Sequence, residues 1–437
     1  MKQPALPSML RALRHRNYRL FFTGQSISLV GTWMTRLATN WLVWRLTDSV
    51  EMLGLIGFAG QAPTFLFASV AGVWVDRLNR HHLLVVTQVV AMLQSFALAA
   101  LVLSGTIKVW EIFALQVLQG IVNAFDMPTR QSLLIDMIDD RADLSNAVAL
   151  NSSMVNAARL IGPSIAGLLI AWVGEGWCFF ADGVSYLAVI ATLLVMQIAL
   201  RPRVGNQKRV LHDLYDGLRY AFEFTPIRAI LLLLAVLGLA GIPYRVLMPV
   251  IASQTLHGNA HTLGFLMGAM GIGALIGALY LAARTSVLGL GRLIPIATII
   301  FGASLIGVGL SHWYLLSLLI MVTTGFGFMV HLAASNTLIQ TLVREEMRGR
   351  VMALYTTAFL GMATFGSLLA GAIAGVIGAP QTLIGGGLVC ILGALIFGSK
   401  LPILRAAARP VYVEKGILPV VTESLREATA MEEKVEQ

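Results

Sequence analysis

Most of the polar side chains that could carry out chemistry in this chain lie inside long apolar stretches, where their spacing is helical. The first stretch carries Gln25, Ser28, Thr32, Arg36 and Thr39 at steps of three to four residues or their multiples. Residues at these steps share one face of a helix. An ionisable side chain at membrane depth costs about 2.5–3.5 kcal/mol on insertion scales, so it needs a partner, water or a function. The stripe therefore predicts a wet cavity or a polar contact between helices.

The fourth apolar stretch repeats this arrangement. Gln116, Gln119, Asn123, Asp126 and Arg130 follow one another at helical steps. A stripe of amides and charges can bind a polar solute or pass protons, and it can equally join two packed helices. Asp126 and Arg130 fall near the end of the stretch, where we assign them to a conformational latch rather than to the substrate.

Four further ionisable residues lie inside other apolar stretches. Asp182 could pair with Arg36 or with Arg159, and a structural pair between packed helices is the alternative to a transport role. His331 is the only histidine in the middle of a stretch; its near-neutral titration would suit proton coupling, and a structural histidine is the competing interpretation. The candidates for a substrate or proton pathway are Gln25, Thr32, Arg36, Gln116, Gln119, Asn123, Arg159, Asp182, Arg245 and His331.

Composition identifies the class of protein. Of 437 residues, 57% are hydrophobic and 12% are charged, and the mean hydropathy is +0.79. A soluble domain carries about 25% charged residues. Apolar runs of roughly 20 residues, enough to span a bilayer as helices, recur along nearly the whole chain. We therefore predict an all-α membrane protein with twelve transmembrane helices in two pseudo-symmetric six-helix bundles. The predicted spans are 20–45, 52–75, 82–103, 110–133, 144–172, 177–199, 227–252, 262–283, 292–310, 313–340, 351–378 and 381–402.

The net charge of +9 is distributed in a way that favours a membrane over nucleic acid. Basic residues cluster in alternate loops, as the positive-inside rule describes, and Lys108 is the main exception. The rule predicts both termini in the cytoplasm. Trp33, Trp41 and Trp44 in the first stretch are interpreted as an interfacial aromatic belt. The expected partners are a small-molecule substrate and membrane lipids, with no nucleic acid.

A short charged connection joins the second and third spans. It contains Gly72, Asp76, Arg77 and Arg80 in the pattern Gly-x-x-x-Asp-Arg-x-x-Arg. An Asp at a helix end can accept bonds from the N-terminal amides of a neighbouring helix, and arginines can pair with carboxylates or lipid phosphates. We expect these residues to belong to the conformational latch that holds two helix bundles in one orientation. An ordinary basic loop that anchors topology is the alternative.

This connection resembles the signature loop between the second and third helices of the major facilitator superfamily. It departs from that loop at Asn79, where the family usually has Gly, and at His81, where it usually has Arg or Lys. The segments 126–131 and 336–340 (Asp-Met-Pro-Thr-Arg-Gln and Asn-Thr-Leu-Ile-Gln), followed by Arg-Gly-Arg-Val at 348–351, are similar to the bacterial enterobactin-exporter and secretion-effector branch. The resemblance covers essentially residues 10–402. It implies two six-helix bundles around a central cavity, export of small molecules by alternating access, and a bacterial inner-membrane location.

The fifth and fourth spans carry two further motifs. Gly162-Pro163, with Ala166-Gly167, is similar to the fifth-helix motif of proton-coupled drug exporters. Proline removes a backbone bond and glycine permits bending, so Gly162 and Pro163 are the expected flex point. The fourth-helix motif of the superfamily, Arg-x-x-Gln-Gly, reads Gln116-Val-Leu-Gln-Gly here. The arginine of the usual motif is therefore missing. A proton relay that requires this arginine is not expected here.

An internal repeat divides the chain into two halves. The segment 162–167 (Gly-Pro-Ser-Ile-Ala-Gly) matches 366–371 (Gly-Ser-Leu-Leu-Ala-Gly) at an offset of 204. The predicted parts are an N-terminal six-helix bundle at 1–200, a cytoplasmic linker with an amphipathic helix at 201–226, a C-terminal six-helix bundle at 227–402 and a cytoplasmic tail at 403–437.

Several function classes are excluded by the motifs that the sequence does not contain. It has no Walker loop, no Gly-x-Ser-x-Gly and no His-Glu-x-x-His, and Cys178 and Cys390 are isolated in separate apolar runs. We therefore expect no enzyme, no cofactor and no metal site. The leading hypothesis is a monomeric, proton-driven exporter (an antiporter) of siderophore-like or drug-like amphipathic molecules. The alternatives are uptake or flipping of a lysolipid-like substrate by the same fold, and a transporter-like sensor.

Overall fold

The computed structural model describes residues 8–197, 210–284 and 286–418; within them, the side chains of 8–9, 68–70, 72–73, 76–77, 141 and 210–214 lie outside the description. The described chain is helical throughout. Among the described residues, ten helical spans are long and apolar enough to cross a membrane by length and composition. Two more helices, α1 and α4, are equally long but carry the polar stripes. All twelve predicted spans therefore coincide with long helices.

The first six spans are unbroken α-helices. They are α1 (Arg16–Thr47), α2 (Val50–Arg77), α3 (Arg80–Leu103), α4 (Val109–Asp136), α5 (Leu144–Val173) and α6 (Glu175–Val195). The connection between α2 and α3 is shorter than the sequence indicates, because only Leu78 and Asn79 lie outside the two helices. The Asn79 side chain accepts a hydrogen bond from the backbone amide of His82, which caps the N-terminus of α3. Charges near this junction thus lie on helix ends rather than on a free loop.

The second six spans are less regular. The first of them runs from α8 (Thr225–Val236) through α9 (Tyr244–Val250), and it contains wider π turns at Leu237–Gly241 and Ile251–Thr255. In a later span, a third π turn at Thr357–Gly361 separates α13 (Arg348–Thr356) from α14 (Met362–Ile377). The remaining spans are α10 (Ala260–Ala282), α11 (Leu290–Leu310), α12 (Tyr314–Leu342) and α15 (Ala379–Ser399), and α7 (Val210–Glu223) and α16 (Leu401–Glu414) are shorter helices outside the spans. A π turn inserts one residue per turn and turns the following side chains to a new direction.

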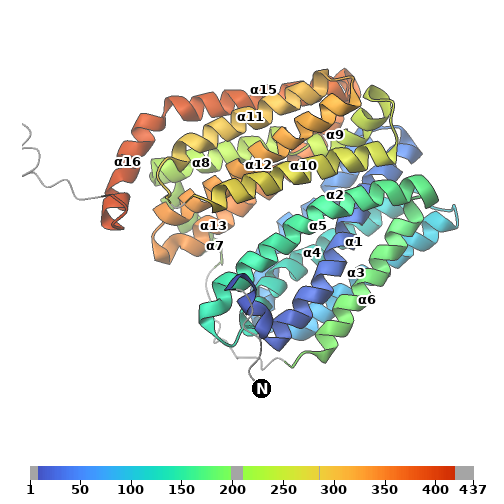
Figure 1. The fold of residues 1–437 in the computed structure, drawn as a ribbon, viewed down its shortest axis with the longest axis horizontal. Coiled ribbons are helices and arrows are strands. Elements are labelled where there is room, and N and C mark those ends of the chain that lie inside the picture. Colours follow the sequence, from blue (N-terminus) through green and yellow to red (C-terminus); the bar gives the residue numbers. More distant parts are fainter. Residues whose placement is uncertain (1–7, 198–209, 285, 419–437) are drawn as a thin grey trace, which may run out of the picture.

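The two sets of six spans form two packed groups (Figure 1). In the first, α1 packs against α5 and α6, and α3 against α4 and α6; in the second, α12 packs against α10 and α11, and α15 against α11. Gly174 joins α5 to α6 with φ 91°, and Gly378 joins α14 to α15 with φ 92°. The left-handed region favours glycine, and the two glycines are also 204 residues apart, so the repeat extends to the backbone.

Although α9 contacts α1 and α2, the most extensive contacts between the groups are those of α2 with α14 and of α5 with α10. Their closest approaches are between glycines. A Cβ at Gly264 would lie 2.8 Å from the Cα of Gly167, and a Cβ at Gly54 would lie 2.9 Å from the Cα of Gly371. We call the end of the molecule at which α1 and α3 begin the basic end. The end at which α1 ends and α2 begins is called the opposite end, and all four glycines lie toward it. In Figure 1 the two groups converge toward the side on which α9 lies.

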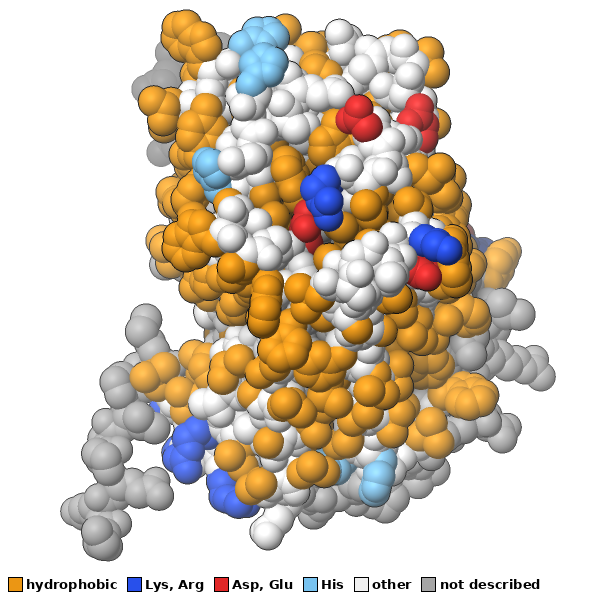
Figure 2. All heavy atoms as spheres, turned by 90° about the vertical axis from the view of Figure 1, so that its right-hand side faces the viewer, with side chains coloured by type: hydrophobic (Ala, Val, Ile, Leu, Met, Phe, Trp, Pro, Cys, Tyr) orange, Lys and Arg blue, Asp and Glu red, His pale blue; other side chains and the backbone are white. Residues whose placement is uncertain are grey.

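The two ends differ in charge. Lys108 is the only Lys or Arg in the connections at the opposite end, among residues 48–49, 104–108, 174, 256–259, 311–313 and 378. Figure 2 faces this end and shows a surface of mostly hydrophobic and uncharged side chains. The basic end carries η1 (Ser8–Arg14), α7 and α16.

Candidate functional site

Asp182 is a buried carboxyl group near the middle of the first helical group. Its residue is 1% exposed. The carboxylate Oδ2 accepts hydrogen bonds from Thr35 Oγ1 at 2.9 Å and from Ser95 Oγ at 2.8 Å, and Ser185 Oγ lies 3.5 Å from Oδ1. These hydroxyls come from α1, α3 and α6, so Asp182 joins three helices.

Asp182 differs from the other buried carboxyl groups in the described part of the chain. Asp126, Asp136, Asp143 and Glu175 each form an ion pair with an arginine. Asp182 forms none with either predicted partner, Arg36 or Arg159, in the described residues. A buried carboxylate without a counter-ion is costly, so its position requires a reason.

Close packing of α1 on α6 holds this group in place. A Cβ at Gly31 would lie 2.5 Å from Ser185 Oγ and 2.6 Å from Asp182 Oδ1. Because any larger residue would overlap these atoms, Gly31 lets α1 approach the carboxyl group directly.

Three arginines from α1, α5 and α9 meet near the same depth. Arg36 and Arg159 both lie over the ring of Trp33, with the guanidinium carbons 4.8 Å and 5.1 Å from its centroid. Arg245 lies 5.8 Å from the Tyr244 ring centroid and 5.9 Å from that of Phe328. The belt interpretation of Trp33 is therefore wrong: the residue is in the middle of α1 and its ring contacts two cations.

Local packing explains where the second and third arginines lie. On α5, a Cβ at Gly162 would lie 2.6 Å from the Cβ of Trp33, so this glycine lets α5 approach α1 one turn after Arg159. On α9, Arg245 follows the π turn that ends at Gly241, and its Nε donates to Tyr244 Oη at 3.2 Å. Gly162 and Pro163 are both buried inside α5 and serve this packing.

The polar stripe of α4 divides into two parts. Asp126 is 3% exposed, pairs with Arg130 on the next turn and accepts a 2.6 Å hydrogen bond from Gln88 Nε2 on α3. Gln119 Nε2 donates to Asn123 Oδ1 at 3.2 Å within α4 itself. Gln116 faces α2, because a Cβ at Gly60 would lie 3.0 Å from its Oε1. The pair Asp126–Arg130 is thus held against α3, whereas the amides before it contact each other within α4 or face α2.

The side chains of Gly72, Asp76 and Arg77 lie outside the described residues, although their backbone is the last part of α2. Arg80, 5% exposed, forms an ion pair with Asp136 at 3.3 Å. This pair joins the start of α3 to the end of α4 at the basic end.

Two candidates on α1 take part in the polar interior of the first group. Gln25 is 2% exposed, and its Oε1 has no hydrogen-bond partner within the described part of the chain. Thr32 Oγ1 donates to the carbonyl of Ser28 and lies 3.5 Å from the hydroxyl of Tyr186. Buried polar atoms without partners are uncommon and mark places where water or a ligand binds.

His331 lies apart from these residues, between α11 and α12. It is fully buried; its Nδ1 lies 2.7 Å from Thr298 Oγ1, and its Nε2 has no hydrogen-bond partner in the described residues. The contact with Thr298 fits a structural histidine, whereas the unpartnered Nε2 offers a place for water or a ligand, so both interpretations of His331 stay open.

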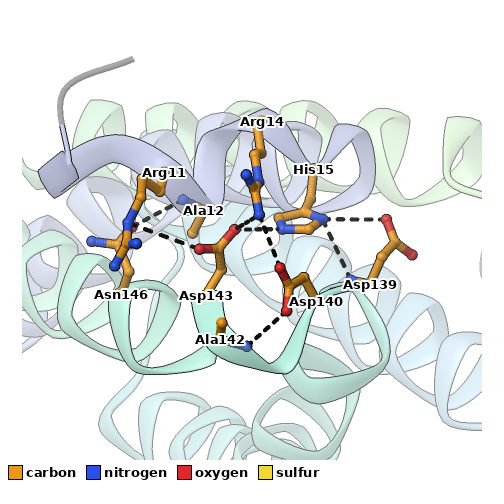
Figure 3. A network of polar contacts seen from close by, with 9 residues as sticks. All are labelled: Arg11, Ala12, Arg14, His15, Asp139, Asp140, Ala142, Asp143 and Asn146. Carbon is orange, nitrogen blue, oxygen red and sulfur yellow. Dashed lines mark hydrogen bonds and ion pairs between the residues drawn. The ribbon is translucent and has the colours of Figure 1, made fainter. Parts of the chain in front are cut away.

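One polar network, which lies at the basic end, was not predicted from the sequence. His15 Nε2 lies 3.0 Å from Asp143 Oδ2 and His15 Nδ1 lies 3.2 Å from Asp139 Oδ2, while Arg14 contacts Asp143 at 2.7 Å (Figure 3). The hydrogen bond from His15, with the nearby arginines, holds the pKa of the Asp143 carboxyl below its ordinary value. In the second half, Asp216 of α7 pairs with Arg350 at 3.2 Å in the corresponding place. In the second half the acid lies on α7, before the first span of that half, and the base lies in the first turn of α13.

Comparisons with known proteins can now be added to this geometry. Residues 7–421 match the family model described as transmembrane secretion effector. The chain belongs to this family. This protein is 26% identical over 386 residues to the staphyloferrin A transporter of Staphylococcus aureus, and the alignment covers 87% of this chain and 95% of the relative. It is 25% identical to the multidrug efflux pump Tap of Mycolicibacterium fortuitum, covering 87% and 95%. It is also 25% identical to the enterobactin exporter EntS of Escherichia coli, covering 93% and 96%.

Solved structures identify the fold of this family member. A POT family transporter in complex with 5-aminolevulinic acid gives a TM-score of 0.71 at 13% identity, covering 89% of this chain and 96% of the other. A bacterial homologue of the lysosomal transporter Spinster, inward-facing and unoccupied, gives 0.67 at 13% identity, covering 91% and 98%. The predicted major facilitator fold is confirmed. The protein is a multi-pass secondary transporter of a small-molecule substrate rather than an enzyme.

Proposed function

We propose that this protein exports amphipathic small molecules, siderophore-like or drug-like, across a bacterial inner membrane by proton-driven alternating access and as a monomer. The observation that carries the proposal is the nearly full-length similarity to three relatives of one family, of which one is named an exporter and another an efflux pump. The charged groups near mid-span support it, because such groups mark substrate and ion pathways in membrane proteins.

The two halves are the moving bodies of this proposal. Residues 1–200 and 227–402 rock against each other, connected by 201–226, and the substrate pathway runs between them. The basic end faces the cytoplasm together with both termini and the tail at 403–437, in keeping with the scarcity of basic residues in the connections at the opposite end. Gly162 and Pro163 are the flex point of α5.

The latch acts at the basic end. Asp76, Arg77 and Arg80 hold the two halves together on the cytoplasmic side, with Asp126 and Arg130 behind them and Gly72 giving room. Replacing Asp76 by Asn weakens this contact and shifts the population toward states closed at the opposite end and open to the cytoplasm. Accessibility of engineered cysteines to a thiol reagent measures the shift; unchanged labelling on both sides would contradict the latch.

Asp182 is the proposed proton carrier. It is a buried carboxyl group without an ion pair in the described residues, bound only by hydroxyls that can accept as well as donate. Such a group can bind and release a proton without breaking a salt bridge. It lies beside the arginine cluster, so its charge influences a substrate bound there.

Accumulation in whole cells tests the function. Cells with and without the protein are exposed to a panel of amphipathic anions, cations and neutral compounds, with and without a protonophore. Lower accumulation that the protonophore abolishes supports proton-driven export. Higher accumulation would replace export by uptake, and no change with the protein verified in the membrane would contradict the transport of soluble compounds.

A further inference from the structure

The three arginines near mid-span lack counter-ions. Among the described residues, Arg36, Arg159 and Arg245 form no ion pair, and Nε of Arg159 is buried without a hydrogen-bond partner. The nearest acid, Asp182, is already bound by three hydroxyls. The centre of the molecule therefore carries an excess of positive charge.

The three cations lie close enough to repel one another. Arg36 and Arg159 lie over the same Trp33 ring, and α9, which carries Arg245, packs against α1. Mutual repulsion at membrane depth is unfavourable, and an anion placed among the guanidinium groups removes it. Guanidinium groups also bind carboxylates with two parallel hydrogen bonds, which a lysine cannot do.

The aromatic rings at this cluster add a second kind of contact. Trp33 is shared by Arg36 and Arg159, and Arg245 lies against Tyr244 and Phe328. Apart from the bond between Arg245 Nε and Tyr244 Oη, these contacts are with ring carbons, which accept no hydrogen bond from a guanidinium N–H in the way that a carboxylate does. Arg36 remains exposed although it is in the middle of α1, so solute can reach it.

We propose that Arg36, Arg159 and Arg245 form the binding site of a small organic anion carrying at least two acidic groups and an aromatic or apolar body. Trp33 gives the flat surface on which this body rests. The inference rests on the proposed function and gives it a substrate class.

The site spans both halves of the protein. Arg36 and Arg159 belong to the first helical group and Arg245 to the second. A substrate with one acidic group cannot engage both sides as strongly as one with two. A dianion therefore binds more tightly to the state in which the two halves are close together around the dianion. Such a difference in affinity between states is what a ligand needs to shift a conformational equilibrium.

A charge series tests the proposal on the purified full-length protein. The probes are benzamide, benzoate, phthalate, trimesate and benzyltrimethylammonium, and the measurements are the thermal unfolding temperature and the Kd at constant ionic strength. We expect affinity to rise from benzamide to trimesate and the cation to give no stabilisation. The double variant Arg159→Gln with Arg245→Gln should weaken trimesate binding by roughly tenfold or more, since each removes a charged hydrogen-bond donor.

Two further variants separate binding from folding. Arg159→Lys keeps the charge but loses the bidentate geometry, so trimesate affinity should fall by less than with Gln. Arg292→Gln changes an exposed arginine on α11 at the basic end and should leave binding unchanged. Equal binding of neutral and anionic probes, or trimesate binding unaffected by the double variant, would overturn the inference.

The cellular panel distinguishes this inference from the proposed function. Protein-dependent export of neutral or cationic compounds without export of polyanions would refute the substrate class and leave the exporter standing. Charge-dependent binding by the three arginines without protein-dependent flux would support the anion site and refute the exporter.

Discussion

The two halves of the molecule share a fold but distribute charge differently. Toward the middle of its spans, the first half carries Arg36, Arg159 and Asp182 on helices without π turns, and it carries Asp126 and Arg130 nearer the basic end of α4. The second half carries Arg245 and His331 at similar depth, and its described spans contain all three π turns. The two repeats share a fold but have therefore diverged: the first half holds its charged groups on helices without π turns, and the second half has helices interrupted by π turns.

This difference suggests separate tasks. Close packing fixes the positions of ionisable groups in the first half, as Gly31 and Gly162 do by allowing α1, α5 and α6 to touch. π turns mark places where a helix can change its register, and they are frequent at functional sites. In this account the first half carries the proton and most of the substrate contacts, and the second half contributes Arg245 and the change of shape.

The largest effect is expected from removing the proposed proton carrier. Asp182→Asn keeps an oxygen acceptor for Thr35 and Ser95, so the fold should persist, but the side chain can no longer take up and release a proton. Export from cells should fall to the background level while trimesate still raises the unfolding temperature of the purified protein. Full export by the variant would show that the charge asymmetry between the halves does not reflect proton coupling.

The next effect concerns the glycine that makes room for this carboxyl group. Gly31→Ala places a methyl group against Ser185 and Asp182, and overpacking of this kind costs about 1–3 kcal/mol. Thermal unfolding in detergent measures the loss. The matched control is Gly385→Ala on α15, where a Cβ meets nothing within 4 Å and a helical alanine should stabilise slightly. Equal unfolding temperatures for the two variants would contradict the tight contact.

A smaller effect is expected at the buried histidine of the second half. His331→Asn removes the contact with Thr298 and should lower stability by about 1 kcal/mol. Because the account assigns proton coupling to the first half, transport by this variant should keep its sensitivity to a protonophore. Loss of that sensitivity in a folded variant would move the proton pathway to α11 and α12.

The smallest effect is a pH dependence at the basic end. The pKa of Asp143 is lowered from its ordinary value of 3.8, so its ionised form stabilises the folded state at neutral pH. That contribution is present above the ordinary pKa and is lost as the pH falls through the lowered one. Unfolding temperatures between pH 5 and pH 3, compared for the wild type and Asp143→Asn, should converge toward the acidic end. Curves that stay parallel would exclude a role for this carboxylate.

Hydropathy was enough to predict most of the spans, because a run of about 20 apolar residues has few alternatives to a transmembrane helix, whereas α1 and α4 are made less apolar by their polar stripes. Ionisable residues such as Arg36 and Asp182 were found for the same reason, since a charge in such a run is conspicuous. Their partners were not. Thr35 and Ser95 are unremarkable residues in helices, and only the packing of α1 and α3 on α6 brings them to one carboxylate.

One interpretation failed and one polar network was missed, because both depend on three-dimensional neighbours. Trp33 has the residue type of an interfacial belt, yet it is near the middle of α1 and its ring lies beside two arginines. Arg14 and His15 were not singled out in the sequence as members of a polar network. The acidic partners Asp139 and Asp143 are more than a hundred residues away, so no local pattern relates them.

Transport driven by an imposed proton gradient tests the central claim most directly. Everted membrane vesicles with an acidified interior contain either the wild type or Asp182→Asn, and the accumulation of labelled trimesate is followed with and without a protonophore. We predict accumulation by the wild type that the protonophore abolishes, and none by the variant. Accumulation that is the same without the gradient, or the same in both proteins, would contradict proton-driven export through Asp182.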